Sequence, residues 1–204
     1  MTDSYIYLEQ GGASPDAPLI FTLHGTGGDE TQFHGFAQET LPGAQIVSPR
    51  GDVSEGGMNR YFKRTGMGVY DMDDLALRTE KLAQFMRGFK GDSGRKTLAL
   101  GYSNGANIIT NLLFAYPDLL DGAVLMHPLI PFDPAPQPGL AGRRILVTAG
   151  RSDGISPEGL TEKLLAYFER QNADVTADWH HGGHEVHNSE IAAITAFLAP
   201  YRDN

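Results

Sequence analysis

The stretch that decides the fold reads Lys-Thr-Leu-Ala-Leu-Gly-Tyr-Ser-Asn-Gly-Ala-Asn-Ile-Ile and spans residues 96–109. Its first half is a short apolar run typical of a buried parallel strand, and residues 106–114 then place apolar side chains on one helical face. Ser103 lies in the turn between them, with Gly101 and Gly105 two residues before and after it. So sharp a turn brings the strand and helix backbones too close for side chains at both glycine positions. This G-x-S-x-G pattern is typical of a nucleophilic serine on a strand-to-helix turn.

By itself this pattern is weak evidence, because a chain with 25 glycines can contain it by chance. The alternative interpretation is a flexible turn without chemistry. A serine hydroxyl is a poor nucleophile at neutral pH, so it needs a general base within hydrogen-bond reach and a carboxylate that orients the base. The rest of the sequence must therefore supply both partners.

The length and composition suit one globular domain without nucleic-acid or membrane partners. A chain of 204 residues falls within the usual range of a single domain, which we expect to span residues 1–204. The net charge of -9 offers no basic surface to nucleic acid or anionic lipid. Without cysteine, the chain forms neither disulfides nor thiolate metal sites. Because no signal-peptide pattern or membrane-spanning run occurs, we expect a soluble, cytoplasmic protein.

Short apolar runs alternate with amphipathic stretches through most of the chain. Besides the strand already described, strands are predicted at residues 5–8, 18–24, 44–48, 122–127, 143–149 and 175–180. Further helices are predicted at residues 29–40, after the acidic residues 71–74, after an N-cap at Ser156 and after an N-cap at Asn188. This alternation predicts a single-domain α/β fold, with a mostly parallel sheet and helices on both faces.

Two connections depart from this alternation. Residues 53–69 are glycine-rich, and we expect an irregular loop that is functional, because its aromatic residues are unusual in disordered segments. Residues 128–142 hold five prolines, which prevent a regular helix or strand, and they are too few for an inserted lid domain. The sequence therefore predicts a fold without a lid.

Polar residues follow the predicted strands where ligands bind in an open parallel sheet, beyond the carboxyl ends. They are the glycine-rich residues 24–28, Ser103, Asp153 and His184. The chain order serine, aspartate, histidine is a known order for a catalytic triad. Asp133 is a rival for the acid, but Asp153 follows a clean strand end more closely. The two glycines before His184 favour it over the other histidines as the base.

A cluster of four histidines also raises the alternative of a zinc site: His180, His181, His184 and His187. His184 and His187 are three residues apart and so miss the H-E-x-x-H spacing that places two ligands on one helical face. A loop could still gather three imidazoles around zinc. That alternative leaves Ser103 and Asp153 without a role, so we expect no metal.

Four motifs together resemble those of the phospholipase/carboxylesterase family of α/β-hydrolases, which includes acyl-protein thioesterases and lysophospholipases. They are Leu23-His24-Gly25-Thr26-Gly27-Gly28, Gly101-Tyr102-Ser103-Asn104-Gly105, Ala149-Gly150-Arg151-Ser152-Asp153 and Gly182-Gly183-His184. Residues 48–75 look like those of a bacterial subgroup linked to hydroquinone and other aromatic-compound metabolism. One departure is Gly154, because the family commonly has proline directly after the aspartate, and this bears on the stiffness of the loop.

The resemblance implies a serine carboxylesterase that works through an acyl-enzyme and needs no cofactor. Ser103 would be the nucleophile, His184 the general acid and base, and Asp153 the residue that orients the histidine. The oxyanion hole would use the backbone N–H groups of Thr26 and Asn104. This role agrees with a glycine-rich loop that exposes N–H groups.

Without a lid, the site is expected to be open, which favours small or medium-sized carboxylic esters, aromatic esters included, as substrates. Five apolar loop residues are candidates to line that site: Tyr61, Phe62, Leu129, Ile130 and Phe132. Arg60 and Arg64 either receive an anionic group or are simply solvated. The sequence leaves a homodimer open. The main alternative is a non-catalytic module of the same fold that binds small aromatic ligands, and the intact triad counts against it.

Overall fold

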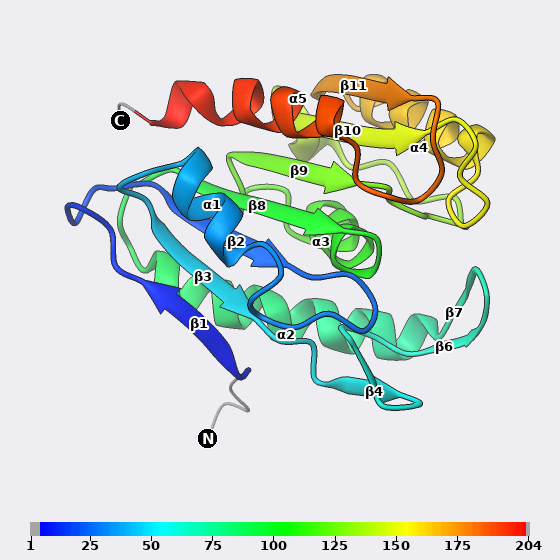
Figure 1. Cartoon of the computed structure of the whole chain (residues 1–204), viewed down its shortest axis with the longest axis horizontal. Helices are drawn as coiled ribbons and strands as arrows, with labels where there is room; N and C mark the ends of the chain where they lie inside the picture. The colour runs from blue at the N-terminus through cyan, green and yellow to red at the C-terminus, as the bar shows by residue number, and fades with distance from the viewer. Residues whose placement is uncertain (1–4, 203–204) are drawn as a thin grey trace.

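A seven-stranded sheet forms the centre of the computed structural model, which describes residues 5–202 (Figure 1). In spatial order its strands are β1 (Tyr7–Gln10), β3 (Gln45–Pro49), β2 (Leu19–Leu23), β8 (Thr97–Tyr102), β9 (Gly122–Met126), β10 (Arg144–Gly150) and β11 (Asp174–His180). Strand β1 pairs antiparallel with β3, whereas the pairs that join β3 through to β11 are parallel. The predicted, mostly parallel sheet is confirmed.

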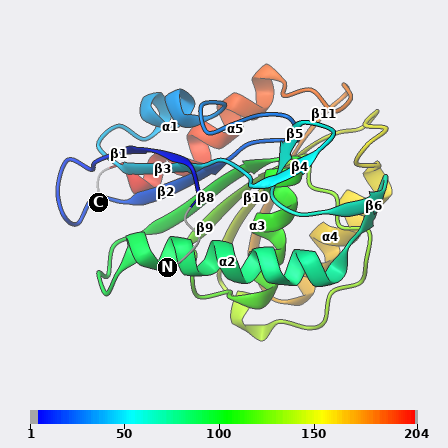
Figure 2. The same ribbon diagram turned by 90° about the horizontal axis from the view of Figure 1, so that it is seen from below.

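Helices cover both faces of this sheet, as predicted. They are α1 (His34–Thr40), α2 (Met72–Lys90), α3 (Asn104–Ala115), α4 (Glu158–Arg170) and α5 (Asn188–Leu198), with short 3-10 turns η1 (Pro138–Leu140) and η2 (Ala199–Tyr201). Helices α2, α3 and α4 pack on one face, and α1 and α5 pack on the other (Figure 2). Helix α1 is shorter than the predicted 29–40, because Asp29 instead forms a local turn with Thr31.

The central strands are mostly apolar because each of their faces meets a separate core. In β2, Phe21 packs against the helices of one face, while Ile20 packs against those of the other. In β8, Ala99 joins the first core, and Leu98 and Leu100 join the second. Since successive side chains of a strand point to opposite faces, a strand buried on both faces shows no polar alternation.

The prediction of an irregular loop over residues 53–69 is wrong. The segment forms two small hairpins, from β4 (Val53–Glu55) with β5 (Met58–Arg60) and from β6 (Arg64–Gly66) with β7 (Val69–Tyr70). Gly56 and Gly57 have φ values of 58° and 86°, as a tight hairpin turn requires. These hairpins lie beyond the edge of the sheet toward which β8, β9 and β10 point (Figure 1).

Two predicted helix caps are also wrong. Ser156 does not cap α4; its hydroxyl donates to the carbonyl oxygen of His127 at 3.0 Å. Helix α5 is capped by His187 rather than Asn188, in a capping box that uses Glu190. The Ser156 hydroxyl is thus taken by a tertiary contact, whereas the start of α5 is set by a local capping box one residue earlier than predicted.

The connection from β9 to β10 crosses the surface without forming a separate lid domain in the described part of the chain. It contains the short turn η1 and otherwise irregular backbone, as its prolines predict. Between residues 5 and 202, none of the helices combines the length and the apolar character that crossing a membrane requires.

Candidate active site

Ser103 occupies the sharp turn between β8 and α3. Its φ of 50° lies in the left-handed region, which residues other than glycine rarely adopt. A Cβ atom on Gly101 would lie 2.6 Å from the backbone of Gly105, and one on Gly105 would lie 2.5 Å from the carbonyl oxygen of Leu23. The steric need for glycine at both positions is therefore confirmed, and the turn holds the Ser103 side chain at the end of the sheet.

Ser103, His184 and Asp153 come together although three separate strand ends carry them. The Oγ atom of Ser103 lies 2.9 Å from Nε2 of His184, and Nδ1 of His184 lies 2.7 Å from Oδ2 of Asp153. With a neutral histidine, Nδ1–H donates to the carboxylate and Nε2 accepts from the serine hydroxyl. This arrangement can transfer the serine proton to the imidazole as the oxygen attacks.

The loop that carries His184 is fastened to the neighbouring strand ends. The Tyr102 hydroxyl donates to the carbonyl oxygen of His184 at 2.6 Å, and the Ser152 N–H donates to the carbonyl oxygen of Gly182 at 3.0 Å. A Cβ atom on Gly150 would lie 2.0 Å from the carbonyl oxygen of Gly183, so this loop packs directly on the end of β10. The histidine is thus held beside the serine by the backbone as well as by its ring.

Asp153 is buried, and every oxygen of its carboxylate accepts hydrogen bonds. Oδ1 accepts from the N–H groups of Ile155 and Ser156, both at 2.8 Å. Oδ2 contacts His184 and also Nδ1 of His127, at 2.9 Å. Burial alone would raise the pKa of Asp153, but these hydrogen bonds outweigh it and hold the pKa below its usual range. The carboxylate therefore stays ionised where it orients His184.

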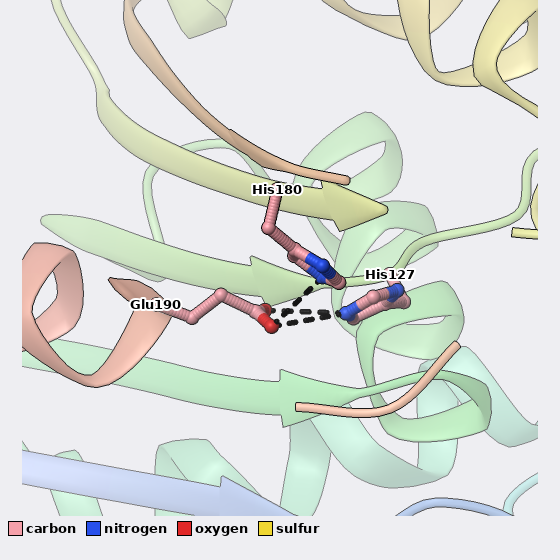
Figure 3. Close-up of side chains that lie close together, drawn as sticks. All are labelled: His127, His180 and Glu190. Atoms are coloured by element: carbon pink, nitrogen blue, oxygen red, sulfur yellow. Dashed lines mark hydrogen bonds and ion pairs between the residues drawn. The ribbon is translucent and has the colours of Figure 1, made fainter. Parts of the chain in front are cut away.

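His127 continues the hydrogen-bonded chain into the interior, where it meets Glu190 and His180 (Figure 3). Nε2 of His127 lies 3.2 Å from Oε2 of Glu190, and Nε2 of His180 lies 3.2 Å from Oε1. Glu190 also accepts from the Thr148 hydroxyl and, at 2.6 Å, from the N–H of His187. His127 and Glu190 are fully buried, so this carboxylate is surrounded by donors in place of water.

The two carboxylates and the histidine between them shift one another's pKa. Burial would lower the pKa of His127, but its hydrogen bonds to Glu190 and Asp153 raise it above the usual value. Burial would raise the pKa of Glu190, but its bonds with His127, Thr148 and the His187 N–H lower it. Each ring nitrogen of His127 lies within hydrogen-bond distance of one carboxylate, so the protonated ring, which the raised pKa favours, can donate on both sides.

The sequence reasoning missed His127 and Glu190, although both carried a signal. His127 directly follows β9, at the same sheet edge as Ser103, and its φ of 51° marks a second strained turn. Glu190 stands three residues after His187, which is the spacing of a capping box. A polar residue at a buried strand end indicates a partner that the local sequence does not reveal.

The four histidines considered for zinc do not converge. His184 contacts Ser103, the His180 ring stacks on the His187 ring at 5.2 Å, and His181 is exposed. Within the described residues, two other groups are close enough to hold an ion: His127 with His180 and Glu190, and His127 with Asp153 and His184. Hydrogen bonds of the chain itself already occupy the carboxylate oxygens of both groups.

The glycine-rich loop of residues 24–28 borders the same site. His24 braces it, because its Nδ1 lies 2.7 Å from the carbonyl oxygen of Gly25 and its Nε2 accepts from the Gly51 N–H at 2.9 Å. Thr26 lines the cavity around Ser103 together with Asn104, the first residue of α3. The first N–H groups of a helix have no partner within it, so the Asn104 N–H is available to a ligand.

A cavity of about 320 Å³ opens over Ser103 and His184. Of the five residues predicted to line it, Leu129 does so. The prediction is wrong for Tyr61 and Phe62, whose side chains are fully buried; the Tyr61 hydroxyl donates to the Pro49 carbonyl oxygen at 2.7 Å. Ile130 and Phe132 line a different cavity, against α4, so their prediction is wrong as well.

Comparisons with known proteins agree with this fold. None of the protein-family models matches the chain. MhqD of Bacillus subtilis (strain 168), which is named as a hydrolase, is 38% identical over 180 residues, which are 85% of this chain and 90% of that protein. Atu2452 of Agrobacterium tumefaciens str. C58, a protein of unknown function, has a similar structure, with a TM-score of 0.92, 48% identity and coverage of 98% and 99% of the two chains. A carboxylesterase of Bacillus cereus has a TM-score of 0.89, 34% identity and coverage of 98% and 95%.

Proposed function

The chain belongs to the phospholipase/carboxylesterase family of α/β-hydrolases, and on that premise we propose that it is a serine carboxylesterase for small or medium-sized esters. The observation that carries the proposal is the hydrogen-bonded series from Ser103 through His184 to Asp153. Relatives named hydrolase and carboxylesterase support the same class of reaction.

In the first step, the Ser103 oxygen attacks the ester carbonyl carbon while His184 accepts the serine proton. Asp153 holds the imidazole in the required tautomer and stabilises its positive charge. The carbonyl oxygen becomes an oxyanion that the N–H groups of Thr26 and Asn104 face in this proposal. Each such donor contributes about 3 kcal/mol to stabilisation of the transition state.

In the second step, the C–O bond to the alcohol breaks, and His184 gives its proton to the departing alkoxide. The acyl group stays on the Ser103 oxygen. Water then attacks the acyl carbon while His184 accepts a proton, and the carboxylic acid leaves as the proton returns to Ser103. Every proton is accounted for by the triad, so the reaction needs no cofactor.

The cavity supports a substrate of limited size. Its volume of about 320 Å³ is at the small end of ligand sites, and Met58, Tyr70 and Leu129 give it apolar wall. Short and medium acyl groups fit this description, and so do aromatic esters, for which Tyr70 offers a ring. A homodimer and a cytoplasmic location stay predictions of the sequence.

Covalent labelling tests the proposal. A fluorophosphonate should modify the wild-type protein at Ser103, and Ser103→Ala should lose both the label and the turnover of 4-nitrophenyl butyrate. Ser93→Ala is the matched control, because Ser93 is an exposed serine bonded to the Lys90 carbonyl oxygen, and it should behave as wild type.

Two other outcomes would overturn the esterase proposal. Retention of turnover in Ser103→Ala together with its loss on adding a chelator would point to a zinc hydrolase. Binding of small aromatic ligands without labelling or turnover would point to a non-catalytic module.

A further inference from the structure

The cavity over Ser103 has a charge opposite to that of the whole protein. The chain carries 25 acidic and 16 basic residues, which give the net charge of -9. Yet among the described residues that line this cavity there are two arginines, Arg60 and Arg64, and no aspartate or glutamate. Neither arginine has a part in the proposed reaction. The positive charge of this cavity in an otherwise acidic protein therefore needs another explanation.

Arg60 is built into the cavity wall. It is 3% exposed, and its Nη1 donates to the Thr26 hydroxyl at 2.6 Å while its Nε donates to the Phe62 carbonyl oxygen at 3.2 Å. Burial and the nearby charge of Arg64 lower the pKa of Arg60, but a guanidinium stays charged at neutral pH. A cation is thus fixed beside the Thr26 side of the site, largely out of water.

One carboxylate serves both arginines. The Glu55 oxygens lie 3.0 and 3.1 Å from Nε of Arg64, and Oε2 also lies 3.3 Å from Nε of Arg60. Glu55 is half-exposed and lies outside the cavity lining, in the neighbouring surface hollow. One negative charge against two guanidinium groups leaves this wall with a net positive charge that faces Ser103.

We propose that the cavity selects esters that carry a carboxylate, which Arg60 and Arg64 receive while the ester lies at Ser103. Guanidinium groups bind carboxylates with paired, charge-assisted hydrogen bonds, and such bonds are stronger where water is excluded. The apolar side chains of Met67, Tyr70 and Leu129 would contact the linker between the two groups. This inference rests on the proposed esterase activity and names its substrate class.

Pairs of esters that differ in one charge test the inference. For the acyl side, the pair is 4-nitrophenyl hydrogen glutarate and 4-nitrophenyl pentanoate; for the alcohol side, it is 4-acetoxybenzoate and phenyl acetate. In the wild type, kcat/KM should favour the anion in at least one pair. In Arg64→Gln, the ratio of the two kcat/KM values in that pair should fall about tenfold, mainly through KM, because a charge-assisted bond is lost.

The matched control is Arg144→Gln. Arg144 is the first residue of β10, at the end of the strand away from the cavity, so this substitution should leave the ratio unchanged. Arg60→Lys, checked for folding by thermal unfolding, should lower the ratio as well, because lysine does not reproduce the planar guanidinium.

Raising NaCl from 50 to 500 mM should lower kcat/KM for the anionic ester more than for the neutral one, because salt screens the attraction between the carboxylate and the arginines.

The outcomes separate this inference from the proposed function. If no ester is hydrolysed and Ser103 is not labelled, the esterase itself is wrong. If the neutral esters are hydrolysed but neither anion is preferred, or if Arg64→Gln and Arg60→Lys leave the ratio unchanged, the esterase stands and the carboxylate site is overturned.

Discussion

Two regions meet at His184, one buried and held by the central sheet, the other partly exposed and formed by the two hairpins. On its inner side, Asp153, His127 and Glu190 form a hydrogen-bonded series of buried groups. On its outer side, the two hairpins of residues 53–70 contribute Arg60 and Arg64 to the cavity wall, and the partly exposed Glu55 pairs with both from the neighbouring hollow. The inner region depends on the sheet, so it can change little without unfolding. The outer region lies beyond the sheet, and its Glu55 and Arg64 are partly exposed, so a change of charge at these two positions should cost little stability.

The largest effect is expected at the group that both regions serve. Ser103→Ala removes the proposed nucleophile, so kcat/KM for 4-nitrophenyl butyrate should fall by at least about 10⁴-fold while thermal unfolding changes little. Stopped assays at high enzyme concentration measure the remaining rate. A fall in kcat/KM of less than about tenfold would mean that Ser103 is not the residue on which turnover depends.

The next effect tests the inner region. Glu190→Ala leaves His127 and His180 without their buried carboxylate, and removing one partner of a buried ion pair costs about 3 kcal/mol or more in free energy of unfolding. Urea unfolding measures the change. Glu158→Ala is the matched control: this helix residue pairs with Arg151 at the surface and should cost less than about 1 kcal/mol. Equal losses in the two variants would contradict the distinction between buried and surface pairs.

The inner region should also impose a pH dependence on stability. The folded-state pKa values of Asp153 and Glu190 are lowered, so their contribution is present above about pH 4 and is lost as pH falls through those folded values. The folded-state pKa of His127 is raised, so its contribution is complete below about pH 6.5, the unfolded value, and is lost as pH rises above it through the folded-state pKa. The difference in unfolding free energy between wild type and Glu190→Ala should therefore be largest between about pH 4 and 6.5. A flat difference from pH 4 to 9 would be inconsistent with a charged His127.

The smallest effect is expected in the outer region. Glu55→Gln removes the carboxylate between Arg60 and Arg64, but the Glu55 side chain is 38% exposed, so its loss should cost only about 1 kcal/mol in unfolding free energy. Thermal and urea unfolding should give nearly the wild-type values. A loss as large as that in Glu190→Ala would mean that the hairpins are part of the core.

The sequence predicts the sheet and the meeting of Ser103, Asp153 and His184 because these features depend on local patterns. Apolar runs mark strands that are buried on both faces, and the sharp turn at Ser103 requires glycines at fixed positions. Since parallel strands end at one edge, three polar residues after three strands come together whatever the details of packing.

The rest depends on contacts between distant segments. Tyr61 and Phe62 resemble site residues in sequence, but their rings fill the core beneath the hairpins. Ser156 has the pattern of an N-cap, yet a distant carbonyl oxygen, that of His127, takes its hydroxyl. Local preference is weaker than a buried tertiary hydrogen bond, so patterns of this kind mislead where a segment meets the active-site edge.

The contact from the Tyr102 hydroxyl to the His184 carbonyl oxygen has a consequence for the timescale of motion. A surface loop with two glycines ordinarily opens within microseconds and exchanges its amide hydrogens quickly. Here Tyr102, the last residue of β8, and Ser152, two residues after β10, hold that loop by hydrogen bonds. Its amides, including the N–H of His187 that binds Glu190, should exchange with deuterium almost as slowly as those of the strands. His184, the proposed base, would then keep its place from one turnover to the next.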